Sequence, residues 1–319
     1  MNDAGDEQAP DVSVTLVLYN SDDHLHACLA ALQGELGSGR AELLVVDNAS
    51  PDLSATIALA AVPRARLITS AVNRGFAGAA NLAWPSVKAR YWLLLNPDVV
   101  LDPDALQELT RWMDQHADVA IASPWLRDAD GAEPAYPGRA FPSVSRVLIE
   151  LLRLHRLLPP GRRGDLLQGS YVVWDTPITV APDWVPGAAM MVRRSAVDTV
   201  GPLDDSFFLY GEDLEWCSRM RRAGWRIATC PSAVATHYAG ASSRRTWPED
   251  EVQARIAAGV AEACRKLRGS RYAQLYAMVT VLALSLEGWH PGRTRAQRSR
   301  AASARRGWLR TLRRACWPA

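Results

Sequence analysis

The hydrophobic and polar positions of this chain form two recurring patterns. Short, nearly continuous apolar runs predict buried strands, and longer stretches with apolar residues three or four positions apart predict helices. In the first half the two patterns alternate, which favours an α/β fold with a mainly parallel sheet and helices on both of its faces. The expected strands are 12–18, 42–46, 66–69, 91–95 and 119–123, and the expected helices are 23–36, 54–61, 75–83 and 103–115.

The second half of the chain is patterned less regularly. Residues 125–182 are rich in proline, glycine and arginine, which predicts an irregular insertion or lid. Beyond it we expect strands at 184–192 and 226–230 and short helices at 195–200 and 213–223. Residues 232–237 lead to a further polar edge, and from 248 onward the pattern predicts a separate helical region.

A mostly apolar segment, 272–289, stands out in this helical region. Its length is at the lower limit for crossing a bilayer. Basic residues flank both of its ends, whereas a single membrane span should show a charge bias between its two sides. The pattern therefore favours a helix lying in the membrane interface or a hairpin dipping into it, with a helix packed against the rest of the protein as the alternative.

Charge is unevenly distributed, although the net charge is only +2. Residues 1–11 contain four acidic residues and no base, and we expect them to be flexible. The segment after Glu287 contains nine arginines and no acid, which favours an anionic membrane surface as a partner. Aromatic residues are absent from this segment between Trp289 and Trp308, so nucleic acid is not expected to bind there.

The five cysteines show no metal-binding or redox spacing, and their number is odd. Reduced thiols in the cytosol are the simplest interpretation. No basic stretch followed by an apolar one begins the chain, so we expect a cytoplasmic protein at the inner face of the cell membrane.

The apolar run 91–95 leads directly into Asn96, Pro97 and Asp98. Pro97 cannot donate a ladder hydrogen bond, so the strand should end there and deliver Asp98 to the carboxyl edge of the sheet. Open α/β sheets bind ligands at that edge, and a carboxylate there suits a hard cation that also takes phosphate oxygens. The alternative is a carboxylate that caps the next helix.

Three more polar clusters follow predicted strands, and parallel strands would bring all four clusters to one edge. Tyr19 and Asn20 follow the first strand, Asp47 and Asn48 the second, and residues 73–81 the third. Each cluster could be a simple turn. Together they suit a nucleotide, although the glycine spacing matches neither the dinucleotide fingerprint nor a P-loop.

Individual residue types suggest individual tasks in this cluster. Asp47 can accept hydrogen bonds from a base or a ribose, and Arg74 can neutralise phosphate. Gly75 and Gly78 allow close backbone approach where a helix N-terminus would face an anion.

A second acidic centre, Glu212 and Asp213, follows the apolar residues Phe208 and Leu209. Asp213 could cap the helix that begins there, or act as a general base on a sugar hydroxyl. His237 follows a short strand, where a metal or phosphate contact is an alternative to a structural role.

These motifs resemble glycosyltransferase family 2, whose members are inverting enzymes with the GT-A fold, and within it the rhamnosyltransferase-like branch. The resemblance covers 13–243 and rests on the motifs at 18–20, 45–50, 73–78, 94–98, 186–188 and 210–213. It implies a catalytic domain at 12–247, with a donor half at 12–124 and an acceptor half at 183–247. Residues 248–319 would form a helical, arginine-rich, membrane-associating region.

The resemblance also implies a role for each matching residue. Nucleotide-sugar contacts would come from Tyr19, Asn20, Asp47, Asn48, Asn73, Arg74, Gly75, Gly78, Asn81 and Asn96. Acceptor contacts would come from Pro186, Gly187, Ala188 and Trp216. Asp213 would be the catalytic base, with Glu212 beside it. Asp98 and His237 would hold Mg²⁺ or Mn²⁺. In the family's Asp-x-Asp motif the first position is Asn96 here, so metal affinity would depend more strongly on Asp98.

The expected activity is transfer of a sugar, with rhamnose from dTDP-rhamnose as the best candidate, to a saccharide acceptor that is lipid-linked, in cell-surface polysaccharide synthesis. The alternatives are a nucleotidyltransferase and a non-catalytic nucleotide-sugar-binding assembly subunit. The first would require a Gly-rich basic signature near the first strand, which this chain lacks.

Overall fold

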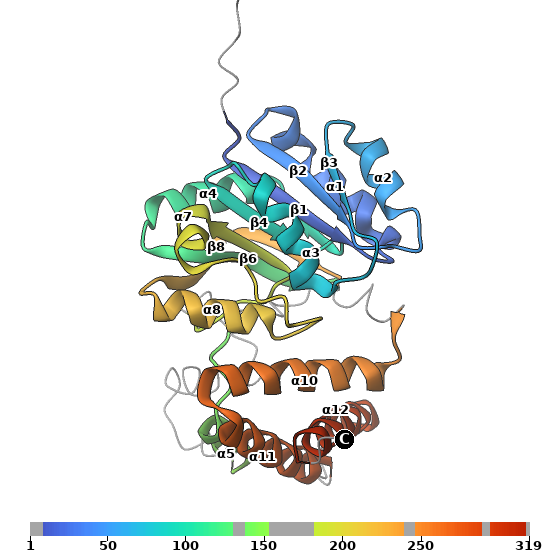
Figure 1. Cartoon of the computed structure of the whole chain (residues 1–319), viewed down its shortest axis with the longest axis vertical. Helices are drawn as coiled ribbons and strands as arrows, with labels where there is room; N and C mark the ends of the chain where they lie inside the picture. Colours follow the sequence, from blue (N-terminus) through green and yellow to red (C-terminus); the bar gives the residue numbers. More distant parts are fainter. Residues whose placement is uncertain (1–8, 130–137, 153–181, 239–245, 289–293, 317–319) are drawn as a thin grey trace, which may run out of the picture.

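The apolar runs between residues 12 and 237 pair into a single eight-stranded sheet with the strand order β3-β2-β1-β4-β7-β6-β8-β5 (Figure 1). The computed structural model describes residues 9–129, 138–152, 182–238, 246–288 and 294–316. Residues 1–8 of the acidic N-terminus and much of the expected insertion therefore lie outside the described residues.

Four parallel strands form the first half of the sheet: β1 (Val12–Leu18), β2 (Ala41–Asp47), β3 (Arg66–Thr69) and β4 (Tyr91–Leu95). The helices between them are α1 (Asp22–Gly37), α2 (Ser54–Ala61) and α3 (Gly75–Ala83), followed by the short turn η1 (Trp84–Ser86). All of β1 and β4 is buried, because helices cover both faces of the sheet. The expected alternation of strands and helices is confirmed here, with boundaries within one residue.

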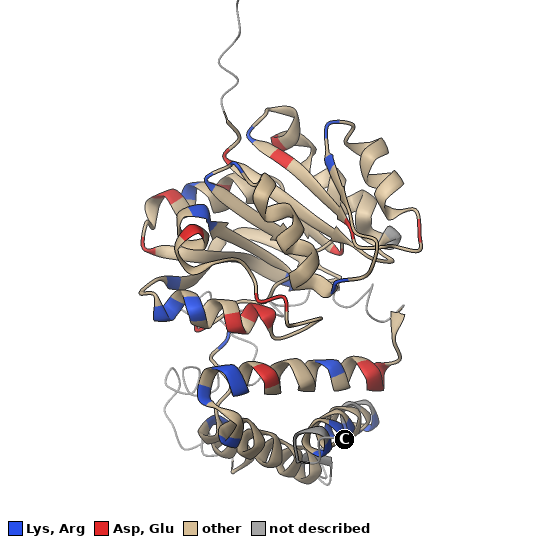
Figure 2. Cartoon of the chain, viewed as in Figure 1, with Lys and Arg blue, Asp and Glu red and all other residues tan. Residues whose placement is uncertain are grey.

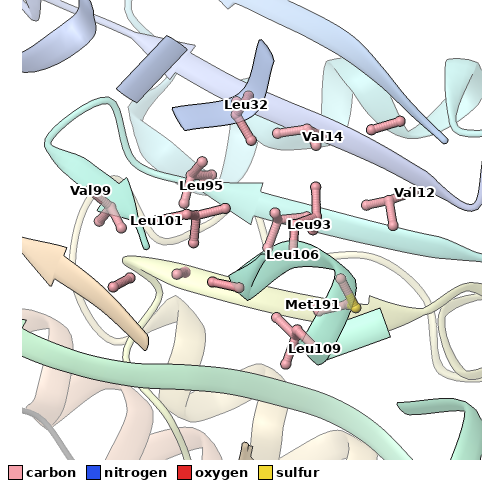
Figure 3. Packing of buried hydrophobic residues seen from close by; sticks show 14 of the residues in the cluster. Val12, Val14, Leu32, Leu93, Leu95, Val99, Leu101, Leu106, Leu109 and Met191 are labelled. Atoms are coloured by element: carbon pink, nitrogen blue, oxygen red, sulfur yellow. The ribbon is translucent and has the colours of Figure 1, made fainter. Parts of the chain in front are cut away.

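Two hydrophobic clusters, one on each face, hold the sheet between its helices. On one face alternate residues of β1 and β4 pack against α1, α2 and α4 (Ala105–Gln115), as Figure 3 shows for Leu32, Leu93, Leu106 and Leu109. On the other face Trp92 and Leu94 pack against α3, α7 (Arg194–Val200) and α8 (Glu212–Arg222). The period of two along each strand is what divides the apolar side chains between the two faces.

The second half of the sheet is mixed and differs from the expectation in several places. β7 (Ala189–Arg193) is antiparallel to both neighbours and begins later than expected, because Pro186 and Gly187 interrupt the apolar run. β6 (Val119–Asp128) extends into the expected insertion, which also contains the helix α5 (Val144–Leu151). β8 (Arg226–His237) is one strand that pairs with β6 across a register shift. The three-residue strand β5 (Val99–Leu101) was not predicted, since it is shorter than the window in which alternation can be read.

Three C-terminal helices form a layer on the far side of α8: α10 (Glu249–Arg268), α11 (Ser270–Gly288) and α12 (Arg295–Cys316) (Figure 1). Ala257, Ala277 and Trp308 form the small core of this layer. Figure 2 shows basic residues recurring along α12, and one of them, Arg306, pairs with Asp250 of α10. None of the helices in the described ranges is long and apolar enough to cross a membrane.

Four cysteines, Cys28, Cys217, Cys230 and Cys264, are buried as free thiols. Burial raises the pKa of Cys28 to about 12, so this thiol stays protonated and unreactive at neutral pH.

Candidate functional site

The four polar clusters meet at one edge of the sheet, as the parallel arrangement requires. Leu18 pairs with Asp47, Asp47 pairs with Thr69, and Leu16 pairs with Leu95 in parallel register. The residues that follow each strand therefore lie along the carboxyl ends of β1, β2, β3 and β4. This edge is where open α/β folds bind their ligands.

Asn48 fastens two of these clusters to each other. It is buried, and its side-chain N–H donates to the side-chain oxygen of Asn73 (3.0 Å) and to the carbonyl of Gly75 (3.2 Å). Its own side-chain oxygen accepts a hydrogen bond from the backbone N–H of Arg74 (2.8 Å). The amide is thus used within the protein, and Asn48 positions the loop that carries Arg74.

Asp52, which sequence reasoning did not single out, organises the ends of β1 and β2. Its carboxylate accepts hydrogen bonds from Ser50, from Ser54 and from the backbone N–H of Ser21. Burial acts to raise its pKa, but these hydrogen bonds outweigh burial and lower it. The serine-aspartate spacing is a signal for such a turn, although it does not reveal that the turn binds a second loop.

The loop after β1 is held in a rarely populated conformation. Asn20 has φ 53°, and its backbone N–H donates to the hydroxyl of Ser50 (2.8 Å). Asp47 accepts a hydrogen bond from the backbone N–H of Ser50 (2.8 Å). Tyr19, Asn20 and Asp47 are therefore preorganised side by side at this edge.

A short chain of hydrogen bonds connects the end of β4 to the acidic centre of α8. The backbone N–H of Asn96 donates to the carbonyl of Ala188 (2.8 Å). The neighbouring Gly187 N–H donates to the Asp213 carboxylate (2.9 Å), whose other oxygen accepts from the Leu214 N–H (2.7 Å). The end of β4 and Asp213, which are far apart in the sequence, are thus linked through Ala188 and Gly187.

The environments of Glu212 and Asp213 favour their protonated forms. Burial, and then the negative charge of Asp213, raise the pKa of Glu212 to about 8. Burial also raises the pKa of Asp213, while the N–H groups of Gly187 and Leu214 and the charge of Arg139 act in the opposite direction. Oε2 of Glu212 is buried and has no hydrogen-bond partner among the described residues. A carboxylate with a raised pKa, held by two backbone N–H groups, has the properties of a general base.

Asp98 and His237 lie next to each other at the junction of β4, β5 and β8. Nε2 of His237 is 3.5 Å from the Asp98 carboxylate, and both side chains are largely buried. Because β5 separates Asp98 from α4, Asp98 does not cap that helix, and this alternative is wrong. The described residues bring no group of three potential metal ligands together. A carboxylate and an imidazole can nevertheless fit a cation that takes its remaining ligands from phosphate.

A close backbone contact with Phe208 requires a glycine at position 75. Its φ is 71°, and a Cβ there would lie 1.9 Å from the carbonyl oxygen of Phe208. The same carbonyl accepts a hydrogen bond from the Phe76 N–H (2.8 Å). The loop before α8 therefore docks on the first turn of α3, and it joins two segments that are far apart in the sequence.

Trp216 and Asn81, which were predicted to contact the substrates, contact other parts of the protein in the structure. Trp216 is fully buried, packs edge-on against Trp92 and donates to the carbonyl of Gly201 (2.9 Å). It is a core residue, so the prediction that it contacts the acceptor is wrong. Asn81 donates to the carbonyl of Leu203 (2.8 Å) and holds the loop after α7.

Sequence profiles place these features in a known group. The profile described as glycosyl transferase family 2 matches residues 13–166, and a profile described as glycosyltransferase like family 2 matches residues 180–255. The chain belongs to glycosyltransferase family 2. It is therefore an enzyme, specifically a glycosyltransferase, which excludes the non-catalytic and nucleotidyltransferase alternatives.

Curated family 2 relatives show the same resemblance over most of the chain. An N-acetylglucosaminyl-diphospho-decaprenol L-rhamnosyltransferase from Mycobacterium tuberculosis is 28% identical over 254 residues, which are 73% of this chain and 77% of the relative. A low-salt glycan biosynthesis hexosyltransferase from Haloferax volcanii is 27% identical over 71% of this chain and 67% of its own. A rhamnosyltransferase from Escherichia coli is 27% identical over 53% and 63%, respectively.

Solved structures confirm the GT-A fold. A mannosyltransferase from Pyrobaculum calidifontis, in complex with GDP-Man and Mn²⁺, has a TM-score of 0.60 at 15% identity and covers 95% of this chain and 87% of its own. Glucosyl-3-phosphoglycerate synthase from Mycobacterium tuberculosis has a TM-score of 0.54 at 18% identity, with 81% and 80% covered.

Proposed function

We propose that this family 2 glycosyltransferase transfers rhamnose from dTDP-rhamnose to a lipid-linked saccharide by a single inverting displacement, with Asp213 as the general base. The observation that carries the proposal is the position of Asp213. Two backbone N–H groups hold its carboxylate at the sheet edge where the four polar clusters converge. The rhamnosyltransferase names of two relatives support the choice of sugar.

In this proposal the donor lies across the carboxyl ends of β1, β2, β3 and β4. Asp47 accepts hydrogen bonds from the base or ribose, and Arg74 and the first turn of α3 face the diphosphate. Asp98 and His237 would hold a divalent cation, which when bound neutralises charge on the leaving diphosphate. The Mn²⁺ in the Pyrobaculum mannosyltransferase complex supports this assignment.

Asp213 removes the proton from the acceptor hydroxyl as that oxygen attacks the anomeric carbon from the face opposite the diphosphate. The proton moves to the Asp213 carboxylate, and the anomeric centre is inverted without a covalent sugar–enzyme intermediate. Glu212, whose pKa is raised, remains protonated beside it at neutral pH and adds no second negative charge.

We further propose that the acceptor is a saccharide on a lipid diphosphate and that the enzyme works at the inner face of the cell membrane. The name of the Mycobacterium tuberculosis relative supports the acceptor. The exposed side of α11 supports the location, because Leu275, Met278, Leu282 and Leu286 are each 44–52% exposed and lie on one face of the helix. The arginines of the neighbouring helix α12 favour anionic lipid headgroups.

Replacing Asp213 with Asn tests the catalytic assignment. The amide cannot accept the acceptor proton, so transfer measured as nucleoside diphosphate release should fall by about 10²–10⁴-fold. Donor affinity, measured by calorimetry with and without Mn²⁺, should stay close to that of the wild type, because Asp213 contacts the acceptor. Asp198→Asn, at an exposed position of α7, is the matched control. Transfer by Asp213→Asn at the wild-type rate would rule out Asp213 as the base.

A further inference from the structure

A groove of about 690 Å³ lies between the loop that precedes α8 and the C-terminal helices. Residues 206–210 form one wall, one face of α10 forms the floor, and the beginning of α11 and part of α12 form the other side. Its volume is in the range of sites for small molecules. None of the expected donor, metal or base residues lines it.

The wall of this groove is also the wall of the donor site. Phe208 turns its carbonyl toward Gly75 and Phe76 of α3, and its ring lies under the guanidinium of Arg255 on the groove side. Tyr210 and Gly211 rest on α10 in backbone contact, since a Cβ on Gly259 would lie 2.0 Å from the Tyr210 carbonyl oxygen. The chain then continues directly into Glu212 and Asp213. A molecule in the groove is thus separated by one loop from the first turn of α3, where the proposed donor site lies.

The floor of the groove is apolar and made of small residues. Ala254, Ala258 and Ala261 of α10 face Ala273 and Ala277 of α11. Small side chains leave room along the floor, and Phe207 and Leu209 add larger apolar surfaces on the loop. Such a surface accommodates a hydrocarbon chain better than a polar saccharide.

The edge of the groove carries positive charge. Arg255, Arg265 and Arg310 line it together with Glu251 and Glu262, which leaves one net positive charge. The Arg255 guanidinium lies 4.3 Å from the ring centre of Trp247 and 5.5 Å from that of Phe208, so two aromatic rings fix its orientation. It pairs with Glu251 at 3.2 Å, while its Nε has no hydrogen-bond partner among the described residues.

A phosphate group can compete for this arginine. Partly exposed pairs such as Arg255 with Glu251 contribute little to stability, and a planar guanidinium binds phosphate oxygens in a bidentate manner. The apolar floor and the oriented arginine together specify a ligand with a hydrocarbon chain and a phosphate or diphosphate head. The groove also begins at the first turns of α11, next to the exposed apolar residues Leu275 and Met278.

We propose that this groove binds the phosphorylated lipid carrier of the acceptor, with the head group at Arg255 and Arg310 and the first part of the chain on the alanine floor. The inference rests on the proposed function, because it assigns the carrier to the same transfer reaction. It makes the C-terminal helices part of the acceptor site in addition to their contact with the membrane.

Farnesyl diphosphate is a probe that carries both halves of this chemistry. Its binding to the full chain is measured by calorimetry in EDTA with excess dTDP, so that the donor site and any metal are not the cause of binding. We expect farnesyl diphosphate to bind at least about tenfold more tightly than inorganic diphosphate, farnesol or dihexanoyl phosphatidylglycerol. Equal affinity for inorganic diphosphate or for the phospholipid would overturn the assignment to a diphosphate carrier.

Two substitutions test the two halves of the groove separately. Arg255→Ala should weaken farnesyl diphosphate binding by about tenfold, and Ala258→Trp should do the same by filling the floor at an exposed position. The matched controls are Arg313→Ala on α12 and Ala223→Trp after α8, which lie outside the groove and should bind as the wild type does.

Wild-type affinity in both groove variants would place the probe elsewhere and overturn the proposal. Because this measurement involves neither donor nor turnover, its failure leaves the transferase mechanism untouched. Conversely, transfer by Asp213→Asn at the wild-type rate would rule out Asp213 as the base but would not affect the measured binding of the probe to the groove.

Discussion

At the scale of single residues, the site depends on how carboxylates and amides are used. Asp213 is held by backbone N–H groups at the sheet edge. The side chains of Asn48 and Asp52, in contrast, form hydrogen bonds that join one loop to another. All are short polar residues next to apolar runs, and their sequence contexts look alike. Only the partners of each side chain distinguish a residue that can meet the substrate from one that positions its neighbours.

Glu212 should make the stability of the protein depend on pH. Its pKa is about 8 when folded and near 4.5 in the unfolded chain, so the folded state binds more protons between these values. The free energy of unfolding should therefore decrease as pH rises from about 4.5 to 8, by on the order of a few kcal/mol at most. Below pH 4.5 the carboxyl is protonated in both states, and this contribution is fully present.

Glu212→Gln should remove most of that dependence, because the amide is neutral at every pH in this window. Urea unfolding at several pH values, compared between wild type and Glu212→Gln, measures the difference. Parallel pH profiles for the two proteins would show that Glu212 is ionised in the folded state.

At the scale of elements, contacts between backbones hold the two halves of the catalytic domain together. Gly75 lets the loop before α8 reach α3, and Gly259 lets the same loop reach α10. Both contacts place a carbonyl oxygen where a Cβ would stand. The loop that leads to Asp213 is thus enclosed between α3 and the C-terminal layer.

Gly75→Ala and Gly78→Ala form a matched pair that tests this arrangement. At Gly75 an alanine must adopt φ 71° and displace the Phe208 carbonyl, so the free energy of unfolding should fall by about 2 kcal/mol or more. At Gly78, in the interior of α3, the nearest atom to a Cβ is Cβ of Arg74 at 3.1 Å, and the change should stay within about 1 kcal/mol. Chemical denaturation measures both. Equal losses in the two variants would contradict the special role of Gly75.

At the scale of the whole molecule, the C-terminal helices lie on the side of α8 that faces away from the sheet, with α10 between α8 and the pair α11 and α12 (Figure 1). α11 buries Ala273 and Ala277 within this layer and exposes a row of four large apolar residues. The two sequence interpretations of this segment, a packed helix and an interfacial helix, are therefore compatible. The arginines that follow form the helix α12, which packs on α10 and α11.

Introducing charge on this row should weaken membrane association. Met278→Glu combined with Leu282→Glu places two carboxylates on side chains that are 52% exposed, so the fold should tolerate them. Binding to vesicles of phosphatidylglycerol and phosphatidylcholine, measured by co-sedimentation, should fall by about tenfold or more. Leu53→Glu, at a 69% exposed position beside α2, should bind like the wild type. Unchanged sedimentation of the double variant would show that α11 is not the membrane contact.

By itself, the sequence determined the strands and helices of the first half of the sheet and the polar clusters at their ends. Buried strands are read from local apolar runs, and parallel pairing then makes the ends of those strands converge. The fold class and the position of Asp98 at an edge of the sheet followed from this local information, and the family followed from the resemblance of the motifs.

The tertiary structure alone decided what each side chain contacts. Trp216 lies in the core, β5 separates Asp98 from α4, Asn48 holds a loop, and a groove forms beside the loop that precedes α8. These features depend on contacts between residues far apart in the chain, such as Gly75 with Phe208. Local hydrophobic periodicity carries no information about such contacts, because they are set by how whole elements pack.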